Sequence, residues 1–195
     1  MSSQGAVLAA TIWTSARPRV VFHRCMARNV EIKARVGDPA ALFERCAGLA
    51  GAGPLEIAQD DTFFACPNGR LKLRELSSGR GELIFYQRPD SPGPKESDYR
   101  IYPTGDPALL RQTLTLALGV CGRVRKLRCL FLVGNTRIHL DHVDGLGDFV
   151  ELEVVLADGE SIALGQARVE DLMTRLLILP ENLLPGAYVD MLPPR

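Results

Sequence analysis

The chain has 195 residues with 23 basic and 23 acidic side chains, so its formal net charge is zero. A hydrophobic fraction of 46% and a charged fraction of 24% exclude a disordered chain and are typical of one globular domain with its own core. The charge balance gives no reason to expect binding to a nucleic-acid backbone, and no segment is apolar over the roughly 20 residues that cross a bilayer.

The first 26 residues differ in composition from the rest of the chain. They contain several arginines, serines and threonines, and the first acidic residue is Glu31. This composition is compatible with a mitochondrial transit peptide, and equally with a flexible leader ahead of an alternative start at Met26. The five cysteines have no metal-like spacing, which suggests a reducing compartment. We expect a flexible leader and a cytoplasmic protein, with a mitochondrial location as the alternative.

From Asn29 onward, short segments of alternating polar and apolar residues are separated by Gly, Pro and Asp. Alternation with a period of two predicts half-buried β-strands. A segment with three prolines and a glycine, residues 89–95, predicts a surface loop instead. Strands are predicted at residues 29–36, 57–65, 69–76, 82–88, 98–102, 123–133, 136–142 and 148–156.

Two Asp-Pro pairs predict the starts of helices. Asp38-Pro39 and Asp106-Pro107 each offer an N-capping side chain followed by proline at the first helical position. Apolar residues at helical spacing follow each pair, up to Gly51 and Gly119, and a third helix is predicted at about 161–177. Seven or eight mainly antiparallel strands with three helices favour an α+β fold, a closed barrel or strongly curved sheet with helices outside it.

Several predicted strands carry charge on one face. The simplest explanation is that this face meets water, as in many antiparallel sheets. The signs are sorted, however, because strands 69–76 and 123–133 are basic where strand 148–156 is acidic. Since the helices must cover the apolar face, a curled sheet would bring the charged faces together in an ionic interior. These faces carry Glu31, Lys33 and Arg35; Lys72 and Arg74; Arg88; Lys126 and Arg128; Arg137, His139 and Asp141; and Glu151 and Glu153.

An ionic interior predicts a ligand. Burying so many charges is costly unless a polyanion and a cation neutralise them. Arginine and lysine match phosphate oxygens, and carboxylates are the hard oxygen ligands that Mg²⁺ or Mn²⁺ prefers. The charged faces therefore predict a metal-chelated triphosphate or polyphosphate as the ligand.

The residues Val30-Glu31-Ile32-Lys33-Ala34-Arg35 resemble the ExExK signature of the CYTH superfamily, also called triphosphate tunnel metalloenzymes. That family includes class IV adenylyl cyclases, thiamine triphosphatases and inorganic triphosphatases. The resemblance covers about residues 27–192 and implies one CYTH domain, an eight-stranded antiparallel tunnel. Further similar stretches follow in the family's order: Gln59-x-Asp61-x-Phe63-Phe64, Gly69 to Arg74, Tyr86-x-Arg88, Lys95-x-Ser97-x-Tyr99, Lys126-x-Arg128, Arg137 to Asp141, Gly145 to Glu153, and Tyr188-x-Asp190-x-Leu192.

The resemblance also implies roles for the charged residues. Metal ligation falls to Glu31, Glu151 and Glu153, with Asp141 as a further ligand or water-orienting group. Catalysis would involve Glu31, Lys33 and Glu153. The phosphate path would be lined by Lys33, Arg35, Lys72, Arg74, Arg88, Lys126, Arg128 and Arg137.

One residue departs from the family signature. Asn29 stands where the signature begins with Glu, so the site loses one negative charge and should bind metal more weakly, or bind one ion in place of two. His139 either positions a phosphate or is an ordinary hydrogen-bonded strand histidine. Asp60 and Asp61 are interpreted as acids at a strand edge or as acids that support the barrel, with a metal pair as the alternative. Phe63 is interpreted as a core residue.

The leading expectation is a metal-dependent phosphohydrolase acting on inorganic triphosphate or on an organic or nucleoside triphosphate. One alternative is a class IV adenylyl cyclase that makes cyclic AMP from ATP. The other is a non-catalytic module that binds polyphosphate or nucleotide. In each case we expect a small-molecule partner, no nucleic acid and no membrane, and a monomer or homodimer.

Overall fold

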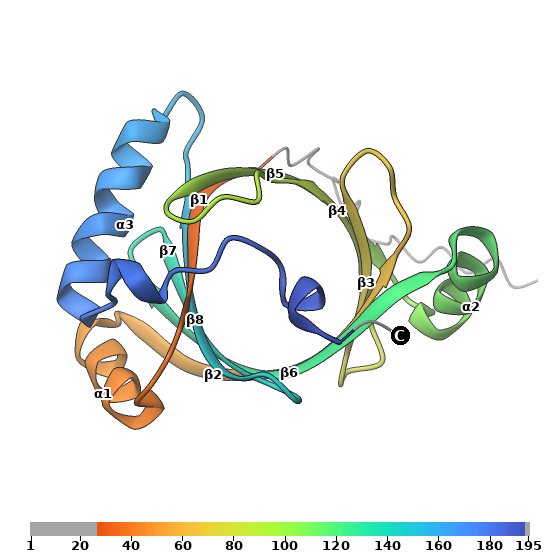
Figure 1. Cartoon of the computed structure of the whole chain (residues 1–195), viewed down its shortest axis with the longest axis horizontal. Coiled ribbons are helices and arrows are strands. Elements are labelled where there is room, and N and C mark those ends of the chain that lie inside the picture. Colours follow the sequence, from red (N-terminus) through yellow and green to blue (C-terminus); the bar gives the residue numbers. More distant parts are fainter. Residues whose placement is uncertain (1–26, 194–195) are drawn as a thin grey trace, which may run out of the picture.

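The computed structural model describes residues 27–193. The predicted leader or transit peptide at residues 1–26 lies outside this range. The described residues form one closed antiparallel barrel in the order β1-β5-β4-β3-β2-β6-β7-β8 (Figure 1). Its strands are β1 (Ala27–Arg35), β2 (Ala52–Phe64), β3 (Arg70–Leu76), β4 (Gly81–Gln87), β5 (Lys95–Thr104), β6 (Val120–Val133), β7 (Thr136–Val143) and β8 (Gly147–Val155).

Three helices flank the barrel, as the sequence predicts: α1 (Pro39–Leu49), α2 (Pro107–Leu118) and α3 (Ile162–Leu176). The Asp38 side chain accepts a hydrogen bond from the Ala41 backbone at 3.0 Å, and Asp106 does the same for Leu109 at 3.0 Å. Each aspartate thus satisfies a backbone N–H that the first turn of a helix leaves without a partner. The α+β class and the closed eight-stranded barrel are confirmed.

Strands β2 and β5 are among those that begin earlier than predicted. Strand β2 starts at Ala52, because Ala52 pairs with Leu132 and a register shift before Leu55 accommodates the intervening glycine and proline. Strand β5 starts at Lys95, within the predicted loop, because Lys95 pairs with Glu31 on β1. Both extensions are tertiary effects, since a partner strand supplies hydrogen bonds that local composition does not indicate.

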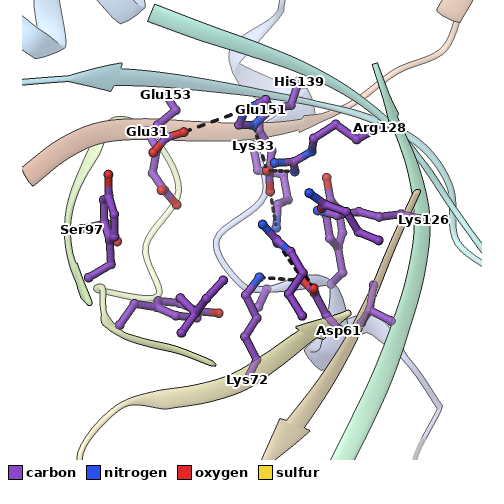
Figure 2. A pocket seen from close by; sticks show the side chains of 18 of the residues that line it. Glu31, Lys33, Asp61, Lys72, Ser97, Lys126, Arg128, His139, Glu151 and Glu153 are labelled. Atoms are coloured by element: carbon purple, nitrogen blue, oxygen red, sulfur yellow. Dashed lines mark hydrogen bonds and ion pairs between the residues drawn. The ribbon is translucent and has the colours of Figure 1, made fainter. Parts of the chain in front are cut away.

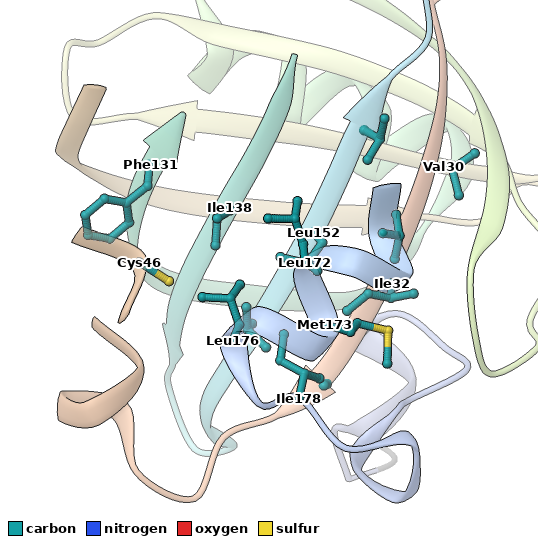
Figure 3. Close-up of a cluster of buried hydrophobic side chains, with 14 of the residues drawn as sticks. Val30, Ile32, Cys46, Phe131, Ile138, Leu152, Leu172, Met173, Leu176 and Ile178 are labelled. Carbon is teal, nitrogen blue, oxygen red and sulfur yellow. The ribbon is translucent and has the colours of Figure 1, made fainter. Parts of the chain in front are cut away.

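The main hydrophobic core lies outside the barrel, between its outer wall and two helices. Figure 3 shows Val30, Ile32 and Leu152 from the barrel wall facing Leu172 and Leu176 of α3. All five side chains are at most 4% exposed. Burial of each such side chain stabilises the fold by about 1.5–3 kcal/mol. Because the apolar face of the sheet packs outward against helices, the inward face is free to be polar.

The chain after α3 crosses one end of the barrel (Figure 1). We call residues 183–191 the C-terminal strap; it ends in the short 3₁₀ helix η2 (Tyr188–Met191), and η1 (Pro180–Asn182) precedes it. The Leu184 backbone N–H donates to the Lys33 carbonyl at 2.8 Å, and Leu183 forms a bridge with Ala34. The strap therefore closes the barrel at the end where β1 reaches Lys33.

Candidate functional site

The interior of the barrel holds a cavity of about 390 Å³. Seven basic and five acidic side chains line it, together with polar and apolar residues from all eight strands and from the strap. The period-two prediction that the charged strand faces meet inside a barrel is thereby confirmed. The charged lining residues are Lys33, Lys72, Arg74, Arg88, Lys126, Arg128, Arg137, Glu31, Asp61, Glu82, Glu151 and Glu153.

Two buried aspartates each hold one lysine and one arginine of a Lys-x-Arg pair. Asp61 accepts from Lys72 Nζ at 2.7 Å and from Arg74 Nε and Nη2 at 2.8 and 2.9 Å. The second pair follows the same pattern. Asp141 accepts from Lys126 Nζ at 3.0 Å and from Arg128 Nε and Nη2 at 2.6 Å each.

Strand register explains this repetition, because Asp61 is the cross-strand partner of Arg74 and Asp141 is the partner of Arg128. Burial alone would raise the pKa of either carboxyl, but the adjacent cations hold both pKa values well below their usual range. Asp61 is thus a supporting acid, as the sequence suggests. The oxygens of Asp141 are already engaged by basic groups.

The aspartates do not fully offset the cost of burying the charges of Lys72 and Lys126. Burial, with the Arg74 charge adding to it, lowers the pKa of Lys72 to about 7. Burial and the adjacent Arg128 likewise lower the pKa of Lys126. The surroundings of each ammonium therefore favour its charged form less than water does. A bound anion nearby would favour the charged form and raise the lysine pKa again.

The acidic side chains gather on two neighbouring strands. Glu31 on β1 is the cross-strand partner of Glu153 on β8, and Glu151 is the partner of Lys33. Figure 2 shows Glu31 and Glu153 across the cavity from Lys72, and Glu151 beside Lys33 and Arg128. Glu151 contacts Lys33 Nζ at 3.1 Å and accepts from Arg128 Nη2 at 2.6 Å, and the positive charges lower its pKa although burial opposes this.

The other two glutamates also have partners. Glu31 is paired with Arg88. Glu153 accepts a hydrogen bond from Asn29 Nδ2 at 2.6 Å and lies 3.3 Å from Arg137 Nη1. Asn29 itself is 2% exposed. The asparagine that departs from the family signature therefore points at a carboxylate instead of repelling it.

The carboxylates suit a divalent metal by their chemistry. Glu31, Glu151 and Glu153 offer hard oxygen donors from adjacent strands on one face of the sheet. Within residues 27–193, however, no three His, Cys, Asp or Glu side chains are grouped as a ready metal cage. Each carboxylate is instead turned toward a neighbouring cation or amide, so the donor set fits a metal that exchanges with these partners.

His139 lies between the acidic residues. Its Nδ1 is 3.6 Å from Glu151 Oε2, and its Nε2 is 3.9 Å from Glu153 Oε2. Burial, reinforced by the Arg128 charge, lowers the pKa of His139, so the ring is neutral at pH 7. A neutral imidazole at this position can donate to a ligand oxygen without adding charge.

Most predicted site residues meet in the cavity, and two do not. Seven of the eight predicted phosphate-binding residues line it; Arg35 is exposed beyond its end, stacked over Phe149 at 5.0 Å. Asp141 lies behind Lys126 and Arg128 and is absent from the lining. Phe63, expected in the core, is 6% exposed and also faces the cavity.

Two further residues, to which the sequence assigned no role in the site, join the strap to it. The Tyr188 ring lies 3.6 Å below Lys33 Nζ, and its hydroxyl donates to Asp141 at 3.0 Å. Lys95 Nζ donates to the carbonyls of Ser91 and Pro185, both at 2.7 Å. Each residue lies in a stretch that resembles the family, and that resemblance was the available signal.

The sequence model of the CYTH domain matches residues 27–188. The chain belongs to the CYTH domain family. Members of this family are enzymes, triphosphatases or adenylate cyclases, and are generally dependent on divalent metals. The matched range contains the whole barrel and ends within the strap.

One curated protein and two solved structures are similar to most of this chain. The chain is 27% identical over 168 residues to the adenylate cyclase CyaB of Aeromonas hydrophila, covering 82% of this chain and 86% of that protein. A Pyrococcus horikoshii protein superposes with a TM-score of 0.75 at 23% identity, covering 85% of this chain and 99% of the other. A conserved hypothetical protein from Pyrococcus furiosus superposes with a TM-score of 0.74 at 18% identity, covering 84% of this chain and 99% of the other. These structural likenesses bear on the fold.

Between residues 27 and 193, no helix is long and apolar enough to cross a membrane.

Proposed function

We propose that this CYTH protein is a metal-dependent phosphohydrolase that binds a triphosphate-containing substrate inside its barrel. One observation carries the proposal: seven basic side chains, together with Glu31, Glu151 and Glu153 from the neighbouring strands β1 and β8, line one cavity that the strap closes at one end. A triphosphate chelated by a divalent cation carries both charge signs in one compact ligand. It therefore complements both sets of side chains at once.

The two Lys-x-Arg pairs, which we call the basic wall, are held in place before any ligand binds. Asp61 and Asp141 fix the two Lys-x-Arg pairs by short hydrogen bonds, so their donors need little reorganisation to meet phosphate oxygens. Fixed donors of this kind stabilise charge that builds on a leaving phosphate in the transition state. Lys33, held over the Tyr188 ring, adds a further charge at the closed end.

The acidic wall would hold the metal, with Glu31, Glu151 and Glu153 as ligands to Mg²⁺ or Mn²⁺. When bound, such an ion supplies Lewis-acid polarisation of phosphate oxygens. Glu31 or Glu153 would orient the attacking water. Asn29 lowers the negative charge of this wall, which fits one ion better than two.

Two substitutions test the assignment of the walls. In a phosphate-release assay with Mg²⁺, Glu151→Gln and Lys72→Met should each lower kcat/KM at least about 100-fold, the size seen when one preorganised charge-stabilising group is removed. Glu170→Gln, on the exposed face of α3, is the matched control and should retain activity. Full turnover in both cavity variants would contradict the proposal.

A class IV type of adenylyl cyclase is the second candidate. The observation that favours it is the 27% identity to a protein named adenylate cyclase. The same cavity could hold ATP while the ribose hydroxyl, in place of water, attacks the phosphate. Product analysis with ATP separates the two reactions: cyclic AMP with pyrophosphate marks a cyclase, and orthophosphate with ADP marks a hydrolase.

A non-catalytic binder is the third candidate, favoured by Asn29 and by the lack of a ready metal cage among the described residues. Such a module would bind triphosphate tightly and turn over none of it at any metal concentration. If Asn29→Glu then conferred activity, the missing carboxylate would be the cause.

A further inference from the structure

The two ends of the cavity differ in chemistry. At the strap end, Lys33 Nζ and Lys95 Nζ approach strap carbonyls, and Arg70 Nη1 donates to Asp190 at 2.7 Å. At the opposite end the cavity lining includes Ile57, Ile101 and Leu130. We call these three residues the collar.

Strand periodicity shows how the change occurs. Inward-facing residues recur every second position, so each strand can be followed from the strap end to the open end. Strand β2 presents Asp61, then Gln59, then Ile57. On β6 the same order runs Lys126, Arg128, Leu130, and on β5 it runs Ser97, Tyr99, Ile101. On these three strands the inward side chains thus change from polar, and charged on β2 and β6, to aliphatic within three inward positions.

The collar is solvent-accessible. Ile101 is 46% exposed, and Leu55 and Leu132, which continue the inward faces of β2 and β6 past the collar, are 57% and 40% exposed. Two charged side chains, Arg137 and Glu82, also line this end. Five aliphatic side chains around one opening form an apolar surface that water covers poorly, and such surfaces mark binding sites.

A second observation comes from Asn29, beside Glu153. Its Nδ2 donates to Glu153 Oε1 at 2.6 Å, which fixes the amide orientation because a carboxylate only accepts. Its Oδ1 is buried and has no hydrogen-bond partner among residues 27–193. Ionised phosphate has no hydrogen to donate, so a phosphate cannot satisfy this oxygen. A ligand hydroxyl or amine can.

We propose that the collar is a head-group site, and that the substrate is an organic triphosphate whose apolar ring covers the collar and whose hydroxyl or amino group donates to Asn29. Inorganic triphosphate, which consists only of phosphate groups, would leave both features unused. The inference rests on the proposed function, because the phosphates must occupy the basic part of the cavity for the head group to reach the open end.

The test compares ligands in equilibrium titrations of the full chain with EDTA present, so that neither turnover nor metal ligation by Asn29 contributes. The probes are ATP, thiamine triphosphate and inorganic triphosphate. Ile101→Ser should weaken the binding of at least one organic triphosphate about tenfold, which is the change in Kd expected from losing roughly 60 Å² of buried apolar surface. It should weaken inorganic triphosphate less than about threefold. Asn29→Ala should likewise weaken the binding of the organic triphosphate more than that of inorganic triphosphate.

The matched control is Tyr102→Ser, because Tyr102 is the next residue on β5, faces outward and is 66% exposed. It should leave the ratio of affinities as in the wild type. Equal losses for organic and inorganic ligands in Ile101→Ser would overturn the head-group site but not the proposed function. Failure of every triphosphate to bind, in EDTA and again with Mg²⁺ in its place, would overturn both. Conversion of a dimer to a monomer by Ile101→Ser, seen by light scattering, would show that a second copy covers the collar and would also overturn it.

Discussion

At the scale of single residues, neighbouring aspartates on β2 have different roles. Asp61 faces the cavity, its side chain is 3% exposed, and it neutralises Lys72 and Arg74. Asp60 faces outward, is 25% exposed, and pairs with Arg123 and Arg125. Period-two parity alone distinguishes the two carboxylates. Removal of a buried partner leaves uncompensated charge, whereas an exposed ion pair contributes little.

Asp61→Asn should therefore lower the free energy of unfolding by about 3 kcal/mol, because two buried cations lose their counter-charge. Asp60→Asn, the matched control on the outer face, should cost about 1 kcal/mol or less. Urea denaturation followed by circular dichroism measures both values. Equal losses in the two variants would show that the Asp61 cluster is hydrated like a surface pair.

Lys72 gives the site a dependence on pH. Its pKa of about 7 in the free protein means that it loses its proton as pH rises through 7, and a bound phosphate would hold the proton on. Affinity for triphosphate should therefore fall as pH increases above 7, by up to about tenfold per pH unit. Calorimetric titrations at pH 6 to 8.5 measure this. Lys72→Arg keeps its charge throughout, so it should remove the part of the slope that the ligand's own titration does not explain.

At the scale of helices and strands, the periodic pattern predicted most of the barrel and the inward charges. Alternation in β1 and β8 is strong because their outward residues pack against α3 in the main core. The collar was missed although Ile57, Leu130 and Ile101 share parity with charged neighbours. Alternation alone does not mark apolar residues on a charged face as part of a cavity lining, which these three residues are.

The strap could not be predicted from periodicity. Its contacts are a backbone hydrogen bond from Leu184 to Lys33, a ring under an ammonium and carbonyls around Lys95. None of these leaves a repeating pattern in the sequence. The early start of β5 has the same origin, since pairing with β1 extends the strand into a segment rich in proline and glycine.

The approach of α3 to the barrel depends on one glycine. A Cβ at Gly165 would lie 2.8 Å from both Leu156 Cδ2 and Val30 Cγ2, within the closely packed core. Gly165→Ala should thus lower the free energy of unfolding by about 1–3 kcal/mol, which exceeds the gain of about 1 kcal/mol in helix propensity. Gly48→Ala in α1 is the control, because nothing lies within 4 Å and only the propensity gain remains. Thermal melting of both variants should give shifts of opposite sign; a stabilised Gly165→Ala would mean that α3 can move away.

At the scale of the whole molecule, the barrel wall separates a buried apolar core on its outer side from a buried charged cavity on its inner side. Apolar residues pack outside the sheet against α1 and α3, and ionisable residues gather inside it. The chain is neutral as a whole, yet its cavity carries an excess of positive charge. Stability and ligand binding are therefore assigned to opposite faces of the same strands, and cavity substitutions can change binding without dismantling the helix-packed core.

The central claim is that this cavity binds and hydrolyses a metal-chelated triphosphate. The most direct test is phosphate release by the full chain from ATP, thiamine triphosphate and inorganic triphosphate, each with Mg²⁺ and with Mn²⁺, alongside thermal melting with the same ligands. We predict metal-dependent release from at least one substrate and a raised melting temperature, since ligand at 100 times Kd adds about 2.7 kcal/mol of stability. Absence of both release and stabilisation across the panel would contradict the claim.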